Sequence, residues 1–306
     1  MTPAAHDLHA AVRAWWSAQA RDLPWRHTRD PYAILVSEVM LQQTQVERVV
    51  PKYREFLTAF PTLEALSAAG PGDVIRVWSG MGYNGRAVRL HRLAQVVVRE
   101  HAGALPASVE ELRALPGIGP YTAAAVACFS FGSAVPVADT NVYRVLSRVH
   151  HGAQAPARAA LDPLVAALVP GPGAPLDASA WHQALMDIGA TLCTAARPAC
   201  GACPLRALCA AAPALEGEVG RALAAASVPY VPKQGRFAGS MRQYRGRVVS
   251  ALRALPAGAA LSLDALGPQV HEGYRHAEHE AWLTALVQRL AADGLVAIGP
   301  GGVRLP

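Results

Sequence analysis

The feature that most constrains this chain is a group of four cysteines in one short segment. Cys193, Cys200, Cys203 and Cys209 lie within CTAARPACGACPLRALC. Thiolates this close along a cytosolic chain are more typical of a metal site than of a disulfide framework. Thiolates bind both zinc and iron–sulfur clusters, so the spacing alone leaves both cofactors open. The fifth cysteine, Cys128, lies in the apolar run AAAVACFSF and is predicted to be a core residue.

The segment that leads to the cysteines has a helical pattern. From Leu8 to about Pro213 apolar residues recur three and four positions apart, without sustained alternation of apolar and polar residues. Asp30 directly before Pro31 is a typical helix start, with an N-cap residue followed by proline in the first turn. Hydrophobic residues make up 52% of the chain, enough for a large core. We therefore predict a mostly α region over residues 1–212.

The remaining residues suggest a linker and a smaller domain. Residues 213–239 lose the helical periodicity, and a second domain is expected over 240–306. Helices are predicted at about 241–254, 262–268 and 278–293, and LVAIGPGGVRLP reads as two short strands around a turn. Three helices and a hairpin indicate a winged-helix-like α+β domain. Such a domain could contact DNA or could only pack against the first region.

The charge balance suits a polyanionic partner. The chain has 28 Lys and Arg against 22 Asp and Glu, a formal net charge of +6, and Lys52 and Lys233 are its only lysines. No apolar stretch reaches the roughly 18 residues of a membrane helix, and the N-terminus does not resemble a signal peptide. We expect a soluble, cytoplasmic, nucleoid-associated monomer without a membrane partner.

A glycine-containing hairpin is the second chemical feature. In LPGIGPYTAAAVA, Gly117 and Gly119 separate a helix that ends at Ala114 from one that begins near Pro120. A tight turn before a helix presents backbone N–H groups and the positive end of the helix dipole, a suitable site for a DNA phosphate. Any tight turn between helices could use the same residues, so the motif alone is a moderate signal.

Two carboxylic acids stand in opposite environments. Glu38 lies within DPYAILVSEVMLQQTQV, predicted as a helix over 30–46 and apolar nearly all round, where burial favours a protonated acid. An ion pair with Arg26 is the structural alternative. Asp139 precedes Thr140 at the start of another helix, where backbone donors favour the anion, although it could be an ordinary N-cap. One protonated and one ionised carboxyl group are what cleavage of a glycosidic bond requires.

In this order, the hairpin, the aspartate and the cysteine loop resemble the helix-hairpin-helix DNA glycosylase superfamily with an iron–sulfur cluster. Within it, six segments resemble the adenine DNA glycosylase (MutY) family: LPWR at 23–26, SEVMLQQTQV at 37–46, GMGYNGRA at 80–87, LPGIGPYTAAAV at 115–126, ALMDIGATLC at 184–193 and the cysteine loop. The resemblance implies a mostly α glycosylase fold, with a six-helix barrel module and a module for a 4Fe-4S cluster that the cysteines bind. It also implies base excision repair, by hydrolysis of the bond to an adenine mispaired with guanine or 8-oxoguanine in double-stranded DNA and flipped from the duplex.

The resemblance also assigns roles to single residues. Glu38 would protonate the adenine and assist water, and Asp139 would stabilise the cationic sugar. The base and sugar pocket would be lined by Arg26, Tyr121, Asn141 and Gln183. Contacts with DNA would come from Gln42, Gln43, Tyr83, Gly117, Gly119, Arg197 and Arg206.

Three departures from the family pattern limit what it implies. Thr140 stands where glycine usually follows the aspartate, and Asn84 stands where a second tyrosine is common. Both changes leave the proposed chemistry in place. The segment 240–306 is too short and has the wrong pattern for the MutT-like module that typically recognises 8-oxoguanine. A preference for 8-oxoguanine over guanine is therefore not predicted.

Other functions remain open at this point. An endonuclease III-like enzyme would need a lysine at position 121, where Tyr121 cannot form an imine, so strand cleavage by that route is not expected. A glycosylase that removes thymine opposite guanine can also carry tyrosine there. A non-catalytic DNA-binding protein with zinc in the cysteine loop would need no acid in the apolar helix.

Overall fold

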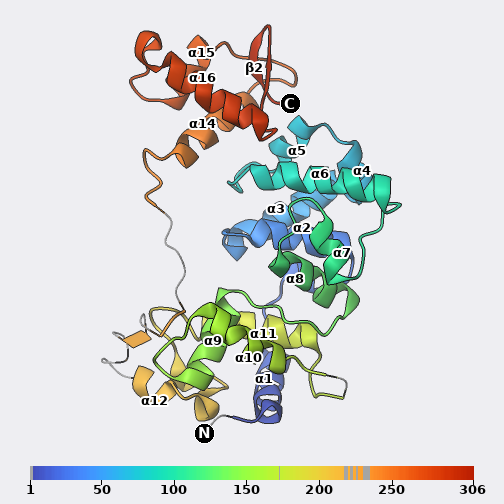
Figure 1. Cartoon of the computed structure of the whole chain (residues 1–306), viewed down its shortest axis with the longest axis vertical. Coiled ribbons are helices and arrows are strands. Elements are labelled where there is room, and N and C mark those ends of the chain that lie inside the picture. Colours follow the sequence, from blue (N-terminus) through green and yellow to red (C-terminus); the bar gives the residue numbers. More distant parts are fainter. Residues whose placement is uncertain (1–2, 172, 217–219, 221–222, 225–226, 230–234) are drawn as a thin grey trace. The chain divides into compact units, whose positions relative to one another are not determined.

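Residues 3–171, 173–216, 220, 223–224, 227–229 and 235–306 are described by a computed structural model (Figure 1). By their contacts the residues form two compact units. The first unit comprises Met1–Ile34, Ala107–Glu110 and Gly119–Lys233, and the second comprises Leu35–Pro106, Glu111–Ile118 and Gln234–Pro306. Helices α2 (Pro31–Leu41) and α7 (Val109–Ala114) each contribute residues to both.

Four long helices form the core of the first unit: α1 (Ala5–Gln19), α9 (Thr140–His151), α10 (Arg158–Ala167) and α11 (Ala178–Thr191). Helix α9 packs against α10 and α11, and α1 packs against α11, around the buried side chains of Leu8, Leu146 and Trp181. Helix α8 (Pro120–Phe131) also contacts α11 and contains Cys128, which is buried as predicted. Among its described residues, the first unit also has the short helices η1 (Pro24–Arg26), η2 (Cys200–Ala202), η3 (Arg206–Leu208) and α12 (Ala212–Leu215).

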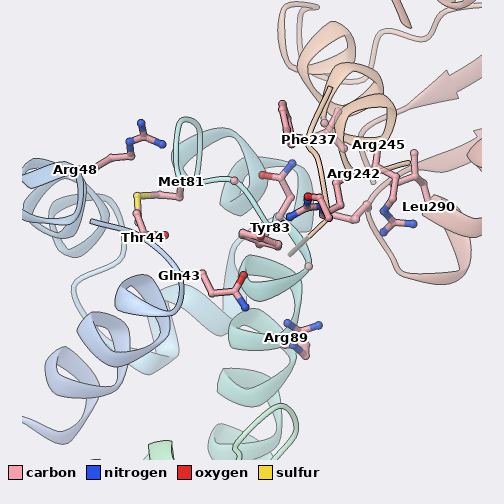
Figure 2. A pocket seen from close by; sticks show the side chains of 17 residues that line it. Gln43, Thr44, Arg48, Met81, Tyr83, Arg89, Phe237, Arg242, Arg245 and Leu290 are labelled. Carbon is pink, nitrogen blue, oxygen red and sulfur yellow. Dashed lines mark hydrogen bonds between the residues drawn. The ribbon is translucent and has the colours of Figure 1, made fainter. Parts of the chain in front are cut away.

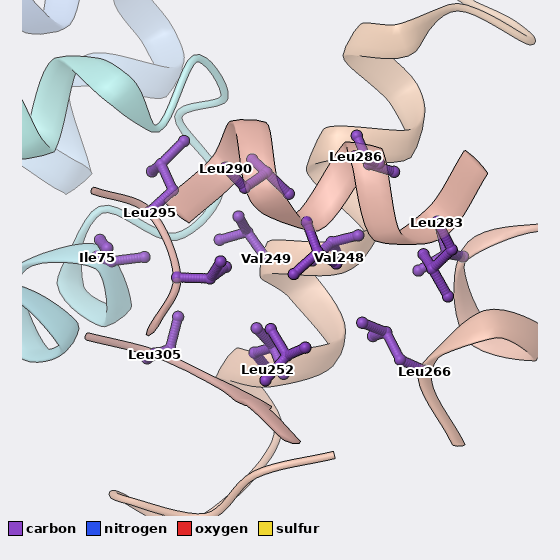
Figure 3. Close-up of a cluster of buried hydrophobic side chains, with 14 of the residues drawn as sticks. Ile75, Val248, Val249, Leu252, Leu266, Leu283, Leu286, Leu290, Leu295 and Leu305 are labelled. Carbon is purple, nitrogen blue, oxygen red and sulfur yellow. The ribbon is translucent and has the colours of Figure 1, made fainter. Parts of the chain in front are cut away.

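The second unit combines residues from the middle and the end of the chain. Its elements are α3 (Val46–Ala59), α4 (Leu63–Ala68), α5 (Pro71–Val77), α6 (Gly85–Glu100), α14 (Met241–Arg253), α15 (Leu263–Val270), α16 (His276–Ala292), β1 (Ala297–Gly299) and β2 (Gly302–Arg304). Helix α6 packs against α4 and α5. Figure 3 shows Ile75 of α5 beside a group of leucines and valines from α14 to the C-terminus, in one apolar cluster.

The C-terminal elements agree with the three helices and the hairpin predicted from the sequence. Strands β1 and β2 pair antiparallel, with Ile298 opposite Val303. This part is tied to α5 by polar contacts, because Arg76 donates to the carbonyl oxygens of Arg253 and Leu255 at 2.8 and 2.9 Å. The domain limits at 212 and 240 stay predictions, and much of the predicted linker at 213–239 lies outside the described residues.

The helix predicted over residues 30–46 is wrong in its extent. It begins as expected, because the carboxylate of Asp30 accepts from the backbone N–H groups of Tyr32 and Ala33 at 3.1 and 3.3 Å. It ends at Leu41, and a separate helix begins at Val46. Gln43 between them has a φ of +58°, a left-handed conformation that cannot continue a helix.

The prediction of a mostly α chain is confirmed. Over the described residues the pair β1–β2 is the only sheet, apart from a single bridge between Leu261 and Val303. None of the helices in these ranges is both long and apolar enough to cross a membrane.

Candidate functional site

Asp139 is fixed in place by the start of α9. Its Oδ1 accepts from the backbone N–H groups of Asn141 and Val142 at 2.8 and 2.9 Å, so it is the N-cap of this helix. Its Oδ2 accepts from the side-chain amide of Asn141 at 2.6 Å. All three donors require accepting oxygens, which a carboxylate supplies. The structure thus brings together two of the predicted site residues, Asp139 and Asn141.

A buried arginine that sequence reasoning missed supports this pair. Arg144 donates to Oδ1 of Asn141 and to the carbonyl oxygen of Gly189, both at 2.8 Å. Its Nε donates to the carbonyl oxygen of Cys193 at 2.7 Å, and burial lowers its pKa. A chain of hydrogen bonds therefore runs from Asp139 to the first cysteine of the loop. The spacing of aspartate, asparagine and arginine along one helix is the signal that could have revealed it.

Gly189 lets α9 and α11 approach each other at this point. A Cβ atom added there would lie 2.5 Å from the Cβ atom of Asn141, which is closer than carbon atoms can pack. Gly189 lies in ALMDIGATLC, one of the segments that resemble the glycosylase family. The reason why glycine is needed there is the contact with Asn141, which only the folded chain shows. Without a side chain at this position, Asn141 can stand where it bonds Asp139.

Arg26 is held by a carboxylate that the sequence did not indicate. Its two terminal nitrogens donate to the two oxygens of Asp187 at 2.7 and 2.8 Å, and Asp187 is fully buried. Arg21 shares the same carboxylate, and the guanidinium of Arg26 lies 4.8 Å from the centre of the Trp16 ring. The sequence analysis offered an ion pair between Arg26 and Glu38 as the structural alternative. In the structure, the carboxylate that binds Arg26 is that of Asp187. Its pocket role stays a prediction.

Tyr121 lines an open cleft of about 400 Å³ in the first unit. Tyr143 also lines this cleft, and its hydroxyl donates to Asp162 at 2.5 Å. Burial, with help from this carboxylate, raises the pKa of Tyr143. Gln183 donates to the hydroxyl of Ser179 at 3.0 Å within α11. The roles of Tyr121 and Gln183 in a base pocket stay predictions.

Glu38 is buried, as the apolar pattern of its helix predicted. Only 6% of the residue is exposed, and Leu35, Val36 and Met40 around it in α2 are fully buried. Glu38 belongs to the second unit and Asp139 to the first. Their approach to one nucleotide therefore stays a prediction.

The loops that carry Gln42, Gln43 and Tyr83 are joined by another buried arginine. Arg86, in the first turn of α6, donates to the carbonyl oxygens of Val39, Met40 and Gln42 at 2.7 to 2.9 Å and to that of Met81 at 2.9 Å. Further donations reach the Thr44 hydroxyl at 3.1 Å and the Gly82 carbonyl at 3.3 Å. Burial lowers the pKa of Arg86 to about 10, so the group stays charged at neutral pH. Arg86 lies in the GMGYNGRA segment, but nothing in the sequence pattern indicated what it does.

The hairpin has the predicted limits, since α7 ends at Ala114 and α8 begins at Pro120. Gly117 has a φ of +81°, and a Cβ atom there would lie 3.0 Å from the side chain of Arg89. Glycine is therefore required for two reasons, the left-handed backbone and the close arginine. Gly119 is the N-cap of α8 and provides no side-chain cap. Its contact with a phosphate stays a prediction.

The four cysteines of the loop line one small pocket, together with Arg148 and Leu192. Arg148 is fully buried and donates to the Sγ atom of Cys193 at 3.3 Å and to the carbonyl oxygen of Thr194 at 2.7 Å. In the described ranges, no group of three or more His, Cys, Asp or Glu residues has an arrangement that could hold a metal ion. The four cysteines are nevertheless gathered around one pocket.

The two basic residues predicted to present the loop to DNA are both exposed. Arg206 forms a two-point ion pair with Glu216, at 2.6 and 3.1 Å. The backbone of Arg197 bonds the hydroxyl of Thr194. Arg206 would therefore have to exchange a carboxylate for a phosphate.

Comparison with known proteins identifies the family. Residues 36–165 match the HhH-GPD superfamily base excision DNA repair protein model. The chain is 45% identical over 245 residues to the adenine DNA glycosylase of Mycolicibacterium smegmatis, covering 78% of each chain. The chain belongs to the HhH-GPD superfamily of base excision DNA repair proteins.

Other members of the superfamily agree with this assignment. The human adenine DNA glycosylase is 40% identical over 220 residues, which cover 69% of this chain and 40% of the human protein. A thermostable thymine-DNA glycosylase of known structure is 31% identical with a TM-score of 0.61, covering 67% of this chain and 95% of that one. An endonuclease III–DNA complex, 21% identical with a TM-score of 0.57, shares the fold over 68% of this chain and 96% of that one. The predicted fold class and the predicted enzyme class, a DNA glycosylase, are confirmed.

Replacing Arg86 in this HhH-GPD protein should loosen the loops at 42–44 and 81–83. Arg86→Lys keeps the charge but loses the fork that reaches several carbonyl oxygens, so we expect unfolding to become easier by about 1–3 kcal/mol. Urea denaturation measures this change. Arg99→Lys is the control, because Arg99 is an exposed residue of the same helix that pairs with Glu100. Equal stability of the two variants would contradict the role given to Arg86.

Gly189→Ala should displace Asn141 and thereby Asp139. Overpacking of this kind costs about 1–3 kcal/mol, and the base-release rate should fall with it. Thermal unfolding and single-turnover kinetics measure the two effects. Gly246→Ala is the control for stability, because a Cβ atom there meets nothing within 4 Å. An unchanged base-release rate and melting temperature for Gly189→Ala would contradict this prediction, because they would show that a methyl group fits between α9 and α11.

Proposed function

We propose that this protein is an adenine-specific DNA glycosylase that hydrolyses the N-glycosidic bond of adenine mispaired with guanine or 8-oxoguanine. The observation that carries the proposal is the 45% identity to an adenine DNA glycosylase over most of both chains. The fixed carboxylate of Asp139 and the buried carboxyl group of Glu38 supply chemistry suited to this reaction. The substrate is double-stranded DNA, and the protein acts as a monomer associated with the nucleoid.

The proposed mechanism divides the work between the two carboxyl groups. Glu38, a buried residue of the apolar helix α2, donates a proton to the departing adenine and assists the attack of water. Asp139 faces the sugar, where positive charge develops as the bond to adenine breaks. Because the backbone of α9 and Asn141 already hold this carboxylate, little reorganisation is needed when the charge appears.

Removal of thymine opposite guanine is the second candidate, because a thymine-DNA glycosylase shares the fold at 31% identity. The higher identity to adenine DNA glycosylases and the QQT segment at 42–44 favour adenine. Strand cleavage through an imine is not part of the proposal, since Tyr121 stands where a lysine would be needed.

For the cysteine loop we propose a 4Fe-4S cluster rather than zinc. The four thiols surround one pocket, which suits thiolate ligation of a cluster. The family resemblance favours the cluster, and zinc is the alternative because thiolates bind it as well. When bound, the cluster would hold the loop together as a structural group. Arg148 and Leu192 complete the pocket around Cys193, Cys200, Cys203 and Cys209.

Glu38→Gln should abolish base release while DNA binding survives. The substitution removes the acidic proton with little change of shape, so the rate should fall by about two to four powers of ten. Single-turnover release from duplexes with A opposite G, 8-oxoguanine or C, and with T opposite G, measures both the rate and the specificity. Glu47→Gln, which changes an exposed glutamate at the start of α3, should behave as the wild type. Faster release of thymine than of adenine by the wild type would favour the second candidate.

Purified protein should be brown and contain iron and acid-labile sulfide in equal amounts. Cys200→Ser should lose most of the iron, because it removes one of the four thiolates. Cys128→Ala should keep it, since Cys128 is buried in α8 and lies outside the loop. Metal analysis and sulfide determination check this. Colourless protein with one zinc per chain would contradict the cluster and favour the zinc alternative.

A further inference from the structure

A large cleft within the second unit has no part in the proposed chemistry. Its volume is about 660 Å³. One wall consists of the loops that carry Gln43 and Tyr83, and the other consists of residues from Gly235 to Leu295 (Figure 2). The C-terminal part of the chain thus builds a binding surface together with residues that the family resemblance assigns to DNA contact.

The cleft is strongly basic. Arginines enter it from three helices: Arg48 from α3, Arg89 from α6, and Arg242 and Arg245 from α14. None of the described residues that line it is acidic, and Asp293, which pairs with Arg245 at 2.5 Å, lies outside the lining. Within the described ranges, Arg48 and Arg89 have no ion pair with a carboxylate. Positive charge gathered in this way favours a polyanion.

Arg242 connects the two walls. One terminal nitrogen donates to the hydroxyl of Tyr83 at 3.2 Å, and the other donates to the carbonyl oxygen of Gly235 at 2.5 Å. Figure 2 shows Tyr83 between Gln43 and Arg242. The guanidinium is therefore held in position before any ligand arrives, which reduces the entropy lost on binding.

Arg89 extends the basic surface toward the hairpin. Its side chain packs against Gly117, whose backbone belongs to the predicted phosphate-binding turn, and it also lines the cleft. Phosphates follow one another along a DNA strand, so a series of arginines suits a strand better than an isolated anion.

We propose that this cleft binds the sugar–phosphate backbone of DNA, with Arg242 and Arg89 as direct phosphate contacts. The inference rests on the DNA-binding part of the proposed function and assigns a task to the C-terminal residues. Guanidinium groups form paired hydrogen bonds with phosphate oxygens, and such contacts fix a protein on the duplex without reading its sequence. Affinity from this cleft is therefore the same for matched and mispaired DNA.

The test is the salt dependence of binding to two duplexes of equal length, one fully matched and one with a single A opposite G. Arg242→Ala should weaken binding about five- to tenfold at low salt. It should also lower the slope of log affinity against log salt by about one, equally for both duplexes. Arg89→Ala should have the same effect. Arg275→Ala is the matched control, because it removes one exposed arginine outside the cleft and should leave the slope unchanged.

A second variant separates a phosphate contact from a loosened loop. Tyr83→Phe removes the hydroxyl that Arg242 bonds but keeps all four arginines. Because Tyr83 is itself a predicted DNA contact, the affinity can fall, but the slope counts neutralised phosphates and should equal that of the wild type. Arg242→Lys should recover most of the slope, because it restores the charge. A Tyr83→Phe protein that loses as much slope as Arg242→Ala would overturn the proposal.

Two further results would also overturn it. Unchanged slopes for both Arg242→Ala and Arg89→Ala would show that the cleft does not bind DNA. A loss confined to the mispaired duplex would show that the cleft reads a base instead of the backbone. Base release by the wild type is measured in a separate experiment. If the protein does not release adenine, the binding data still decide whether the cleft contacts DNA. If the cleft does not bind DNA, the base-release data still decide the proposed function.

Discussion

Buried guanidinium groups bonded to main-chain oxygen atoms hold the functional segments of this protein. Arg86 gathers carbonyl oxygens from the end of α2 and from the loop before α6, and Arg148 gathers them from the cysteine loop and from Ala224. A carbonyl oxygen inside a protein must find a donor, and one guanidinium carries five N–H groups in a rigid fork. Lysine could not serve in the same way, because its single ammonium group lacks this fork. Arg86 and Arg148 therefore hold loop segments whose carbonyl oxygens have no partner within a helix.

Much of the fold was accessible from the sequence, because it depends on local signals. Apolar periodicity predicted the helices of both units, and the turn residues around Pro300 predicted the hairpin at the C-terminus. The end of α2 was not accessible. Residues 42–46 have no proline or glycine to stop a helix, and the stop comes from the left-handed Gln43 beside the carbonyl oxygens that Arg86 collects. A contact between residues that lie some forty positions apart leaves no trace in a local pattern.

In the candidate site too, local sequence signals indicated some residues, whereas residues that act through long-range contacts were missed. The apolar run that ends before a helix start indicated Asp139, the family resemblance indicated Asn141, and the start of α9 brings the two together. The residues that support them were not indicated, because Arg144 and Gly189 act through packing between two helices. Asp187 is a further example, since a buried acid that binds two arginines looks like any acid in a helix when the sequence is read alone. Sequence patterns predict which groups can react, whereas their supporting contacts require the folded chain.

The link between Cys193 and Asn141 has a consequence for how damage would spread. Arg144 bonds the carbonyl oxygen of the first cysteine at one end and the amide that holds Asp139 at the other. A shift of the backbone at Cys193 would take from Arg144 one of its hydrogen-bond acceptors. A disturbance of the cysteine loop would thereby reach the Asp139 carboxylate at the start of α9, although no cysteine in the described part of the chain touches that side chain.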